Sequence, residues 1–167
     1  NDVAAGLRTP FSAAEEIKRR YGCASSKSVS SSETIEVSST GGREPRVMSR
    51  HVLTEIIEPR VEEILRLVQR ELVRSGFDEF MTAGVVLTGG TALLEGMGEL
   101  AEEIFAMPVR IGFPAGVGGL VDVVNSPVFA TGVGLVLYGA RNGEHAALRS
   151  PAVGFFERVR TRMADWF

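Results

Sequence analysis

The segment GVVLTGGTALLEG (84–96) leads an apolar run into Gly89 and Gly90, and Thr91 follows directly. Ligands of parallel α/β sheets bind beyond the carboxyl ends of the strands, where a glycine lets a flat ring or a phosphate approach the bare backbone. Backbone N–H groups at the start of a following helix would favour an anionic group. The pattern suits a nucleotide site, but a tight turn that packs a helix on a strand has the same sequence and, taken alone, is the simpler explanation.

A second polar group consists of Glu15 and Lys18, which are three residues apart on a predicted helix and so share a face. A carboxylate and an ammonium group in this arrangement can hydrogen-bond neighbouring hydroxyls, such as those of a ribose. They can equally form a solvated ion pair worth about 0.2–0.5 kcal/mol. Taken by itself, the pair is explained more simply as such an ion pair.

The remaining reactive side chains are isolated. Cys23 has no second thiol or histidine near it in the sequence, which indicates a small buried residue, and His51 and His145 stand alone. No Ser-His-Asp set and no metal-ligand spacing is present, so we assign no catalytic residue and no metal ligand. One cysteine fits a reducing compartment, and the net charge of −3 offers no general attraction to nucleic acid.

The elements that must position these residues begin with a helix over 11–21, which Thr9 and Pro10 open through a capping hydroxyl and a first-turn proline. The serine-rich segment that follows has the composition of a loop. Within it, TIEVS (34–38) alternates as a half-exposed strand would, and PRVMS (45–49) can return as a second strand. The sequence leaves open whether the serine-rich segment is ordered.

A long helical pattern runs from Ser49 to Ser75. Pro59 lies inside it and should kink the helix or split it in two, because proline removes a backbone hydrogen bond and clashes with the preceding turn. We expect one apolar face of this helix to pack on the core. That face consists of Val52, Ile56, Ile64, Leu67, Val68, Leu72 and Val73.

The second half of the sequence alternates strands and helices. AGVVL (83–87) has the form of a short strand buried on both faces, a helix over 93–105 follows it, and PVRIGFP (108–114) is the next strand. A glycine-rich loop with a short helix then leads to a last helix from Pro127 to Arg141. This order predicts an α/β fold with a βαβ unit.

The end of the chain carries an amphipathic pattern. After a polar linker over 142–150, the segment GFFERVRTRMADWF (154–167) places its large apolar side chains within about 120° of a helical wheel, flanked by arginines. This layout is typical of a helix that lies in a membrane surface and meets anionic headgroups, and the segment is too short to span a bilayer. A terminal helix packed on its own domain is the alternative. The membrane-facing candidates are Phe155, Phe156, Val159, Arg160, Arg162, Met163, Trp166 and Phe167.

Several motifs resemble the FtsA family of actin-like bacterial cell-division proteins. They are GGREPRVMSRHVLTEIIEPRVEEILRLV, AGVVLTGGTALLEG and ATGVGLVLYG, in this order, preceded by NDVAAGLRTPFSAAEEIKRRYGCA. The segment NDVAAGLRTPFSAAEEIKRRYGCA, at the start of the chain, is similar to the family segment just after the second phosphate loop. The match covers nearly the whole chain, and with the missing initiator Met it implies the C-terminal part of a longer protein.

The resemblance implies a fold and its division. The family has the actin/Hsp70-like (ribonuclease H-like) ATPase fold, two α/β lobes with ATP in the cleft, of which this chain would hold part of one lobe. Residues 1–80 would be subdomain 2B, and 81–141 the C-terminal half of subdomain 2A. A linker over 142–150 and an amphipathic membrane-targeting helix over 151–167 would complete the chain.

The resemblance also assigns nucleotide contacts, with ATP and Mg²⁺ bound by the complete protein. Asp2 matches the acid that ends the second phosphate motif, but the preceding threonine and glycines are missing, as is the first phosphate loop. Hydrolysis is therefore assigned to no residue present, the protein is at most a weak ATPase, and we expect this chain alone to bind ATP poorly. The implied contacts are Gly89, Gly90 and Thr91 in the adenosine motif, and Glu15 and Lys18 toward the ribose and adenine.

Partners follow from the same resemblance. The 2B surface would receive the C-terminal tail of FtsZ, the tubulin-like division protein, through Arg60 and Glu63, and Arg46 would contact a neighbouring subunit when the protein self-associates into filaments. Anionic lipids and other divisome proteins complete the set, which implies the cytoplasmic face of the inner (plasma) membrane at the division site. The alternatives are a sugar or acetate kinase of the actin superfamily and the pilus-assembly protein PilM, neither of which accounts for the aromatic, basic tail.

Overall fold

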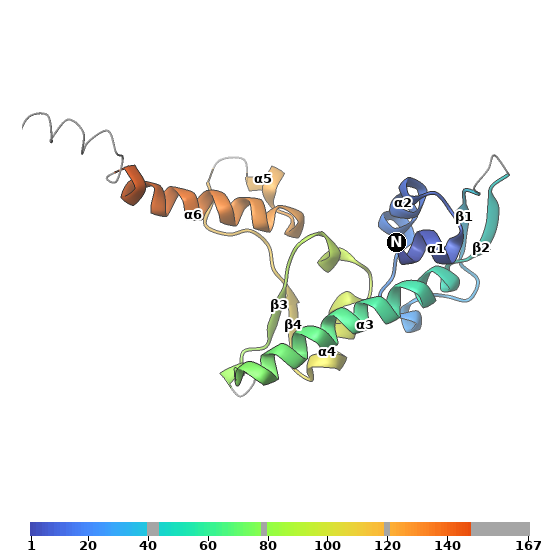
Figure 1. The fold of residues 1–167 in the computed structure, drawn as a ribbon, viewed down its shortest axis with the longest axis horizontal. Coiled ribbons are helices and arrows are strands. Elements are labelled where there is room, and N and C mark those ends of the chain that lie inside the picture. Colours follow the sequence, from blue (N-terminus) through green and yellow to red (C-terminus); the bar gives the residue numbers. More distant parts are fainter. Residues whose placement is uncertain (40–43, 78–79, 119–120, 148–167) are drawn as a thin grey trace, which may run out of the picture.

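The longest element among the described residues is helix α3 (Arg50–Ser75), along which most of the first half of the chain is arranged in the computed structural model (Figure 1). The structure describes residues 1–39, 44–77, 80–118 and 121–147. Helices α1 (Asp2–Leu7) and α2 (Phe11–Tyr21) and a strand pair lie at one end of α3, whereas a second strand pair lies toward its other end and leads into α6 (Ala130–Ala147).

Helix α3 is one continuous α-helix. Ser49 caps its start, where its Oγ accepts a hydrogen bond from the His51 N–H at 3.3 Å, and Gly76 ends it in the left-handed conformation at φ 70°. Pro59 lies inside the helix without splitting it, so of the two predicted outcomes, a kink or a division into two helices, the division does not occur. Contacts with α1 and with α4 (Met97–Phe105) stabilise α3 enough to offset the proline's missing hydrogen bond.

The buried face of α3 differs from the predicted one. Its buried side chains are Leu53, Ile57, Val61 and Leu65, a row at four-residue steps, together with Thr54 beside Leu53. Ile56 and Leu72 of the predicted face pack partly against the core, but Val52, Ile64, Leu67, Val68 and Val73 are exposed. The prediction failed because α3 has apolar residues on two faces, and periodicity alone does not say which face a neighbouring element covers.

The first part of the chain forms a small helical unit with a hairpin. Helix α1 (Asp2–Leu7) packs on α2 (Phe11–Tyr21), and strand β1 (Thr34–Val37) pairs antiparallel with β2 (Arg46–Ser49). Both strands were predicted. Thr9 does not cap α2, since the N-cap position is Pro10 and no side chain caps the helix start. The Thr9 hydroxyl instead donates to the Ser38 carbonyl at 2.6 Å and so joins the start of α2 to the end of β1.

The second part contains the predicted βαβ unit. Strand β3 (Val85–Leu87) pairs in parallel with β4 (Val109–Ile111), and helix α4 (Met97–Phe105) connects them. Val86 is 48% exposed, so the prediction that β3 is buried on both faces is wrong for this chain, where the described part of the sheet has two strands. The helix begins at Met97 rather than 93, because a 3₁₀ turn over Gly90–Leu93 and a left-handed Gly96 come first.

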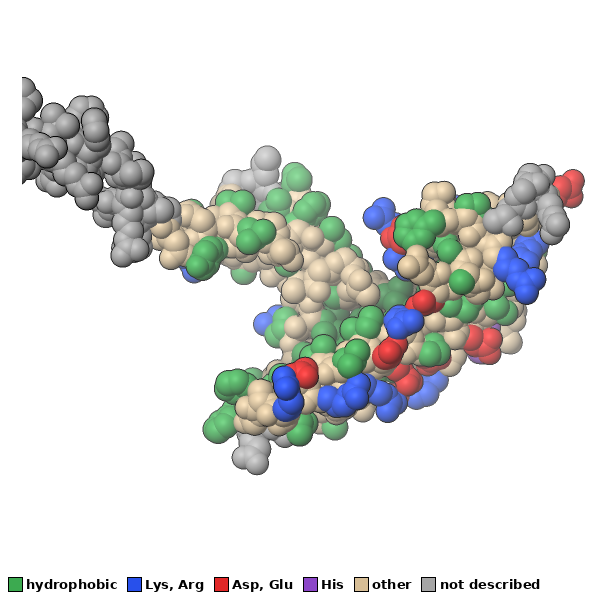
Figure 2. Space-filling view, viewed as in Figure 1, with side chains coloured by type: hydrophobic (Ala, Val, Ile, Leu, Met, Phe, Trp, Pro, Cys, Tyr) green, Lys and Arg blue, Asp and Glu red, His purple; other side chains and the backbone are tan. Residues whose placement is uncertain are grey.

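The chain then passes through a short helix, α5 (Val121–Val124), and a 3₁₀ turn over Pro127–Phe129 into α6 (Ala130–Ala147). This agrees with the predicted short helix and with a last helix near Pro127. Helix α6 continues past Arg141 into the segment expected to be a linker. It leads away from the body and exposes Leu135, Val136 and Tyr138 (Figures 1 and 2).

Candidate functional site

The glycine turn lies at the carboxyl end of β3, as the sequence predicted. Gly89 has φ 92° and ψ 172°, a conformation that side chains strongly disfavour, and Gly90 opens the 3₁₀ turn. Two contacts fix the turn to neighbouring segments. The Thr88 hydroxyl donates to the Gly112 carbonyl at 2.9 Å, and the Gly89 N–H donates to the Pro127 carbonyl at 3.0 Å.

The open side of the turn fits the approach of a flat group. A Cβ added at Gly89 would meet no heavy atom within 4 Å, and one added at Gly90 would meet only Val128 Cγ2, at 3.8 Å. Both glycines therefore leave space over the backbone, and Thr91 beside them is exposed. Because the Gly89 N–H is already bonded to Pro127, the turn offers an apolar backbone surface more than an anion-binding nest.

Glu15 and Lys18 form the ion pair expected from their spacing. Lys18 Nζ donates to Glu15 Oε2 at 2.6 Å, and Arg19 Nε lies 3.5 Å from the other carboxylate oxygen. The hydrogen bond from Lys18, with the nearby Arg19 charge, holds the pKa of Glu15 below its ordinary value. The carboxylate is thus ionised and, with the ammonium group, accessible to a hydroxylated ligand.

Close packing brings the end of α2 to the segment that follows the glycine turn. A Cβ added at Gly22 would lie 2.4 Å from the Lys18 carbonyl oxygen and 2.9 Å from Leu94 Cδ1. One step further, the Ala24 N–H donates to the Glu95 carbonyl at 2.7 Å, beside the buried Cys23. The structure therefore connects, through Gly22 and Leu94, the two elements that carry the predicted nucleotide contacts.

Cys23 is buried, as predicted, and its Sγ donates to the Ser25 carbonyl at 3.2 Å. Burial raises the pKa of this thiol, so it stays protonated at neutral pH. In the described ranges, no group of three or more His, Cys, Asp or Glu side chains is arranged to hold a metal ion.

Sequence reasoning missed Arg50, which joins these elements. Its guanidinium contacts Tyr21 at the end of α2, Glu33 before β1, and Glu95 after the glycine turn. No local pattern reveals this residue, because its partners are far away in the sequence. The only signal was an arginine at the junction of a strand and a long helix.

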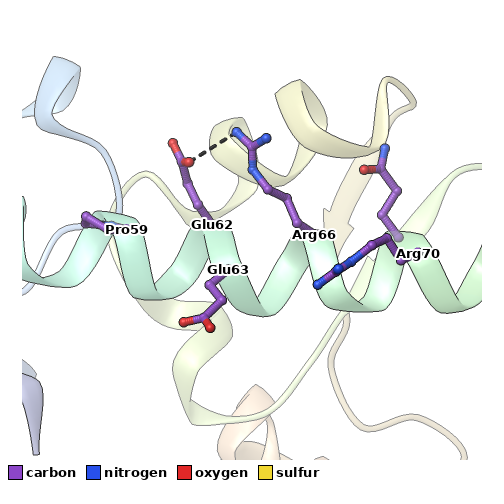
Figure 3. Close-up of a pocket in the computed structure, with 6 residues that line it drawn as sticks. Pro59, Glu62, Glu63, Arg66 and Arg70 are labelled. Carbon is purple, nitrogen blue, oxygen red and sulfur yellow. Dashed lines mark hydrogen bonds and ion pairs between the residues drawn. The ribbon is translucent and has the colours of Figure 1, made fainter.

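A second candidate site is a shallow groove on α3 with a volume of about 530 Å³ (Figure 3). Glu62 and Arg66 project from one side and pair at 3.1 Å, while Glu63 points from the other side of the helix. Acidic and basic side chains alternate along this part of the surface (Figure 2). The groove is lined by Pro59, Glu62, Glu63, Arg66, Gln69 and Arg70.

Arg60 lies next to this groove and is already engaged within the chain. Its Nε donates to Asp2 Oδ2 at 2.6 Å, its Nη2 lies 3.3 Å from Asp2 Oδ1, and its Nη1 pairs with Glu63. This two-point contact lowers the pKa of Asp2. Arg60 and Glu63, predicted to act together toward a partner, are therefore side by side, and Asp2 competes for the same guanidinium.

Arg46, the third predicted partner contact, is exposed on β2. Its Nη2 donates to the Leu7 carbonyl at the end of α1. One guanidinium of five donors can satisfy a single carbonyl and still contact another molecule. The structure thus leaves Arg46 accessible from the hairpin side of the molecule.

The membrane-facing candidates, Phe155, Phe156, Val159, Arg160, Arg162, Met163, Trp166 and Phe167, lie outside the described residues. Among the helices that the structure does describe, none has the length and apolar character needed to cross a bilayer.

Comparison with known proteins gives a consistent match. The family model described as cell division protein FtsA matches residues 1–134. The FtsA protein of Pseudomonas aeruginosa is 57% identical over 139 residues, which cover 83% of this chain and 33% of the relative. That of Escherichia coli K12 is 43% identical over 154 residues, 86% of this chain and 37% of the relative.

A third relative, FtsA of Neisseria meningitidis serogroup B, is 47% identical over 136 residues, 81% of this chain and 33% of its own length. The chain thus spans a third or somewhat more of the length of the relatives it matches. The glycine turn, the α2 pair and the α3 groove all lie within the residues that the family model matches. The chain belongs to the FtsA family of cell division proteins.

Proposed function

We propose that the chain is the C-terminal portion of an actin-like, ATP-binding cell-division protein that tethers FtsZ polymers to the cytoplasmic face of the inner membrane and helps to recruit the divisome. The observation that carries the proposal is the family match over residues 1–134, which includes an open glycine turn at the end of β3. The same match favours this function over that of a sugar or acetate kinase or a PilM-like pilus-assembly protein.

ATP would bind with its adenosine against the turn. Gly89 and Gly90 leave the backbone surface open to an adenine ring, and the Glu15–Lys18 pair offers an acceptor and a donor to ribose hydroxyls. Mg²⁺ and the phosphates, which supply any hydrolytic chemistry, would be held mainly by protein outside this chain. This chain's own residues would bind and orient the nucleoside, so we expect at most a weak ATPase.

Gly90→Ala tests the nucleotide site in the whole-length protein. Because the added methyl group would have only an ordinary contact with Val128 in the free protein, folding should be unchanged, but the methyl would intrude on a bound ring. We expect the Kd for a fluorescent ATP analogue to rise at least about tenfold, the effect of ~1.4 kcal/mol. Gly98→Ala, in α4 and equally uncrowded, is the matched control. Equal affinity of both variants and the wild type would refute the site.

The FtsZ tail would bind over the α3 groove. Paired charges of both signs suit a short peptide of mixed charge, with Arg60 and Glu63 at the rim. Arg60→Glu should weaken binding of an FtsZ tail peptide by about 1 kcal/mol, roughly fivefold. Arg74→Glu is the control on the same helix, since Arg74 pairs with Glu71 outside the groove.

Arg60→Glu also breaks the contact with Asp2, so a further variant separates the two effects. Asp2→Asn removes the competing carboxylate and leaves the Arg60 charge in place. Peptide affinity should stay the same or rise in Asp2→Asn. Loss of affinity in Asp2→Asn equal to that in Arg60→Glu would mean that the ion pair, not the Arg60 charge, matters for binding.

Membrane attachment would come from the amphipathic segment over 151–167. It combines aromatic side chains with arginines that suit anionic headgroups. In a flotation assay with anionic liposomes, the intact protein should float and a protein ending at Arg149 should stay at the bottom. Equal flotation of the two would rule out the tail as the anchor.

Arg46, exposed on the hairpin, would take part in contacts between subunits of a filament.

A further inference from the structure

Arg50 contacts three separate segments with one side chain. Its Nε donates to the Tyr21 carbonyl at 2.8 Å, its Nη1 to Glu33 Oε2 at 2.7 Å, and its Nη2 to Glu95. The Arg50 side chain is only 14% exposed, so these charge-assisted bonds are partly shielded from water. The planar fork fixes the three partners relative to one another, which a flexible lysine would not do.

Glu95 is held through both its side chain and its backbone. Glu95 lies four residues after Thr91, the last residue of the glycine turn. Its carbonyl accepts a hydrogen bond from the Ala24 N–H at 2.7 Å. The next residue, Gly96, is left-handed at φ 75°, and a Cβ there would lie 3.2 Å from the Ser25 backbone nitrogen. The segment after the turn is therefore packed against the segment after α2, so it has little freedom to move independently.

The other side of Arg50 leads to the hairpin. Arg50 directly follows β2 (Arg46–Ser49), and its own N–H donates to the Glu33 carbonyl at 2.9 Å, just before β1. Arg50 thus closes the open end of the hairpin with its backbone while its side chain reaches Glu95. The hydrogen bond from the Arg50 side chain, with a backbone hydrogen bond from Ser30, also lowers the pKa of Glu33.

A second ion pair joins the same two parts of the chain but lacks these features. Lys27 and Glu103 pair at 2.7 Å, with side chains that are 73% and 58% exposed. This pair makes one contact between an extended lysine and a helix surface, and such exposed pairs contribute little. It is a matched control for the Arg50 junction.

We propose that Arg50 is a positioning residue that couples the Gly89–Thr91 turn to the β1–β2 hairpin, so that a nucleotide bound against the turn restricts the hairpin. This inference rests on the nucleotide site proposed above. A ligand that orders the turn also limits the positions of Glu95, and the three-way contact of Arg50 transfers that restriction to the hairpin strands. By linkage, a partner that orders the hairpin would strengthen nucleotide binding by the same factor.

Hydrogen exchange of backbone amides in the whole-length protein, with and without MgATP, tests the coupling. In the wild type, ATP should slow exchange in the glycine turn and the residues directly after it (90–94). It should also slow exchange at least about fivefold in the hairpin strands 34–37 and 46–49. Glu95→Gln keeps the size of the side chain but removes its charge. We expect it to retain the effect of ATP on the turn and to lose the effect on the hairpin. Glu103→Gln should behave as the wild type in both places.

Three outcomes decide the matter. Hairpin protection by ATP in Glu95→Gln equal to that in the wild type would overturn the coupling, as would a wild-type hairpin that does not respond while its turn does. If the wild-type turn itself does not respond, the proposed nucleotide site fails and the coupling fails with it. If Glu95→Gln does not fold, Arg50→Lys, which keeps the charge but not the planar guanidinium, replaces it. In Arg50→Lys, ATP must still slow exchange in the turn but no longer in the hairpin strands.

Discussion

Residues 1–77 and residues 80–147 bury their apolar side chains to different degrees. In the first region α1, α2, the hairpin and α3 enclose a shared core, to which Leu7, Ile35 and Leu53 contribute with almost no exposed area. In the second region α4 joins that core, but the sheet and α6 leave large apolar side chains in contact with solvent. The comparison shows that the first region has a fully buried core, although a second apolar face of α3 stays exposed, whereas the sheet and the described side chains of α6 are at most partly buried.

The difference also separates the two candidate sites. The α3 groove lies on a helix that the core of the first region supports along its buried face. The glycine turn lies where two strands end, and its rigidity depends on Thr88, on Pro127 and on the junction made by Arg50. We therefore expect the groove to keep its geometry in this chain more readily than the turn does.

The largest expected difference in stability comes from replacing one leucine by alanine in each region. Leu53 is fully buried, so Leu53→Ala should lower the free energy of unfolding by about 2–5 kcal/mol, whereas Leu135→Ala, at a side chain that is 67% exposed, should change it by less than about 0.5 kcal/mol. Urea unfolding followed by circular dichroism measures both. Comparable losses would mean that α6 is covered in solution and that the contrast between the regions is false.

A smaller effect is expected at the junction between the regions. Gly22→Ala would press a methyl group against the Lys18 carbonyl and Leu94, and should destabilise the protein by about 1–3 kcal/mol. Gly98→Ala, in α4 with no atom within 4 Å of the new methyl, should be neutral or stabilise by up to about 1 kcal/mol. Thermal unfolding distinguishes the two. A neutral Gly22→Ala would show that α2 and the segment after the turn are not in close contact.

The smallest expected effect is on how the stability of the protein changes as the pH falls. Because the pKa of Glu33 is held below its ordinary value of 4.5, this carboxylate stabilises the fold at higher pH, and its contribution is lost as pH falls below that value. The stability of Glu33→Gln should therefore decline less than that of the wild type on acidification from pH 5 to about pH 3. Glu36→Gln, on β1 and without an ion pair among the described residues, is the control. Parallel curves for all three proteins would contradict the Arg50–Glu33 contact.

Local patterns predicted much of the fold. The alternation in TIEVS gave β1, the apolar run before Gly89 gave β3, and the order of elements gave the parallel βαβ unit. The i,i+3 spacing of Glu15 and Lys18 correctly predicted an ion pair. The start of α4 was placed too early, because a 3₁₀ turn and a helix start look alike in sequence.

The candidate functional residues divide in the same way. Gly89, Gly90 and Thr91 could be proposed from the sequence, since a strand that ends in glycines is a local signal. Arg50 could not be found, because its contacts with Glu33 and Glu95 span 17 and 45 positions. The engagement of Arg60 by Asp2, 58 positions away, was hidden for the same reason.

The sequence by itself determined the order and type of most helices and strands, the position of the glycine turn and the family, because each depends on neighbouring residues or on a linear motif. Only the tertiary structure decided which apolar face of α3 is buried and which charges Arg50 and Arg60 meet. Those outcomes depend on which surfaces α1, α4 and the hairpin cover. The packing of elements that are distant in the chain, and not the period of a single helix, sets that choice.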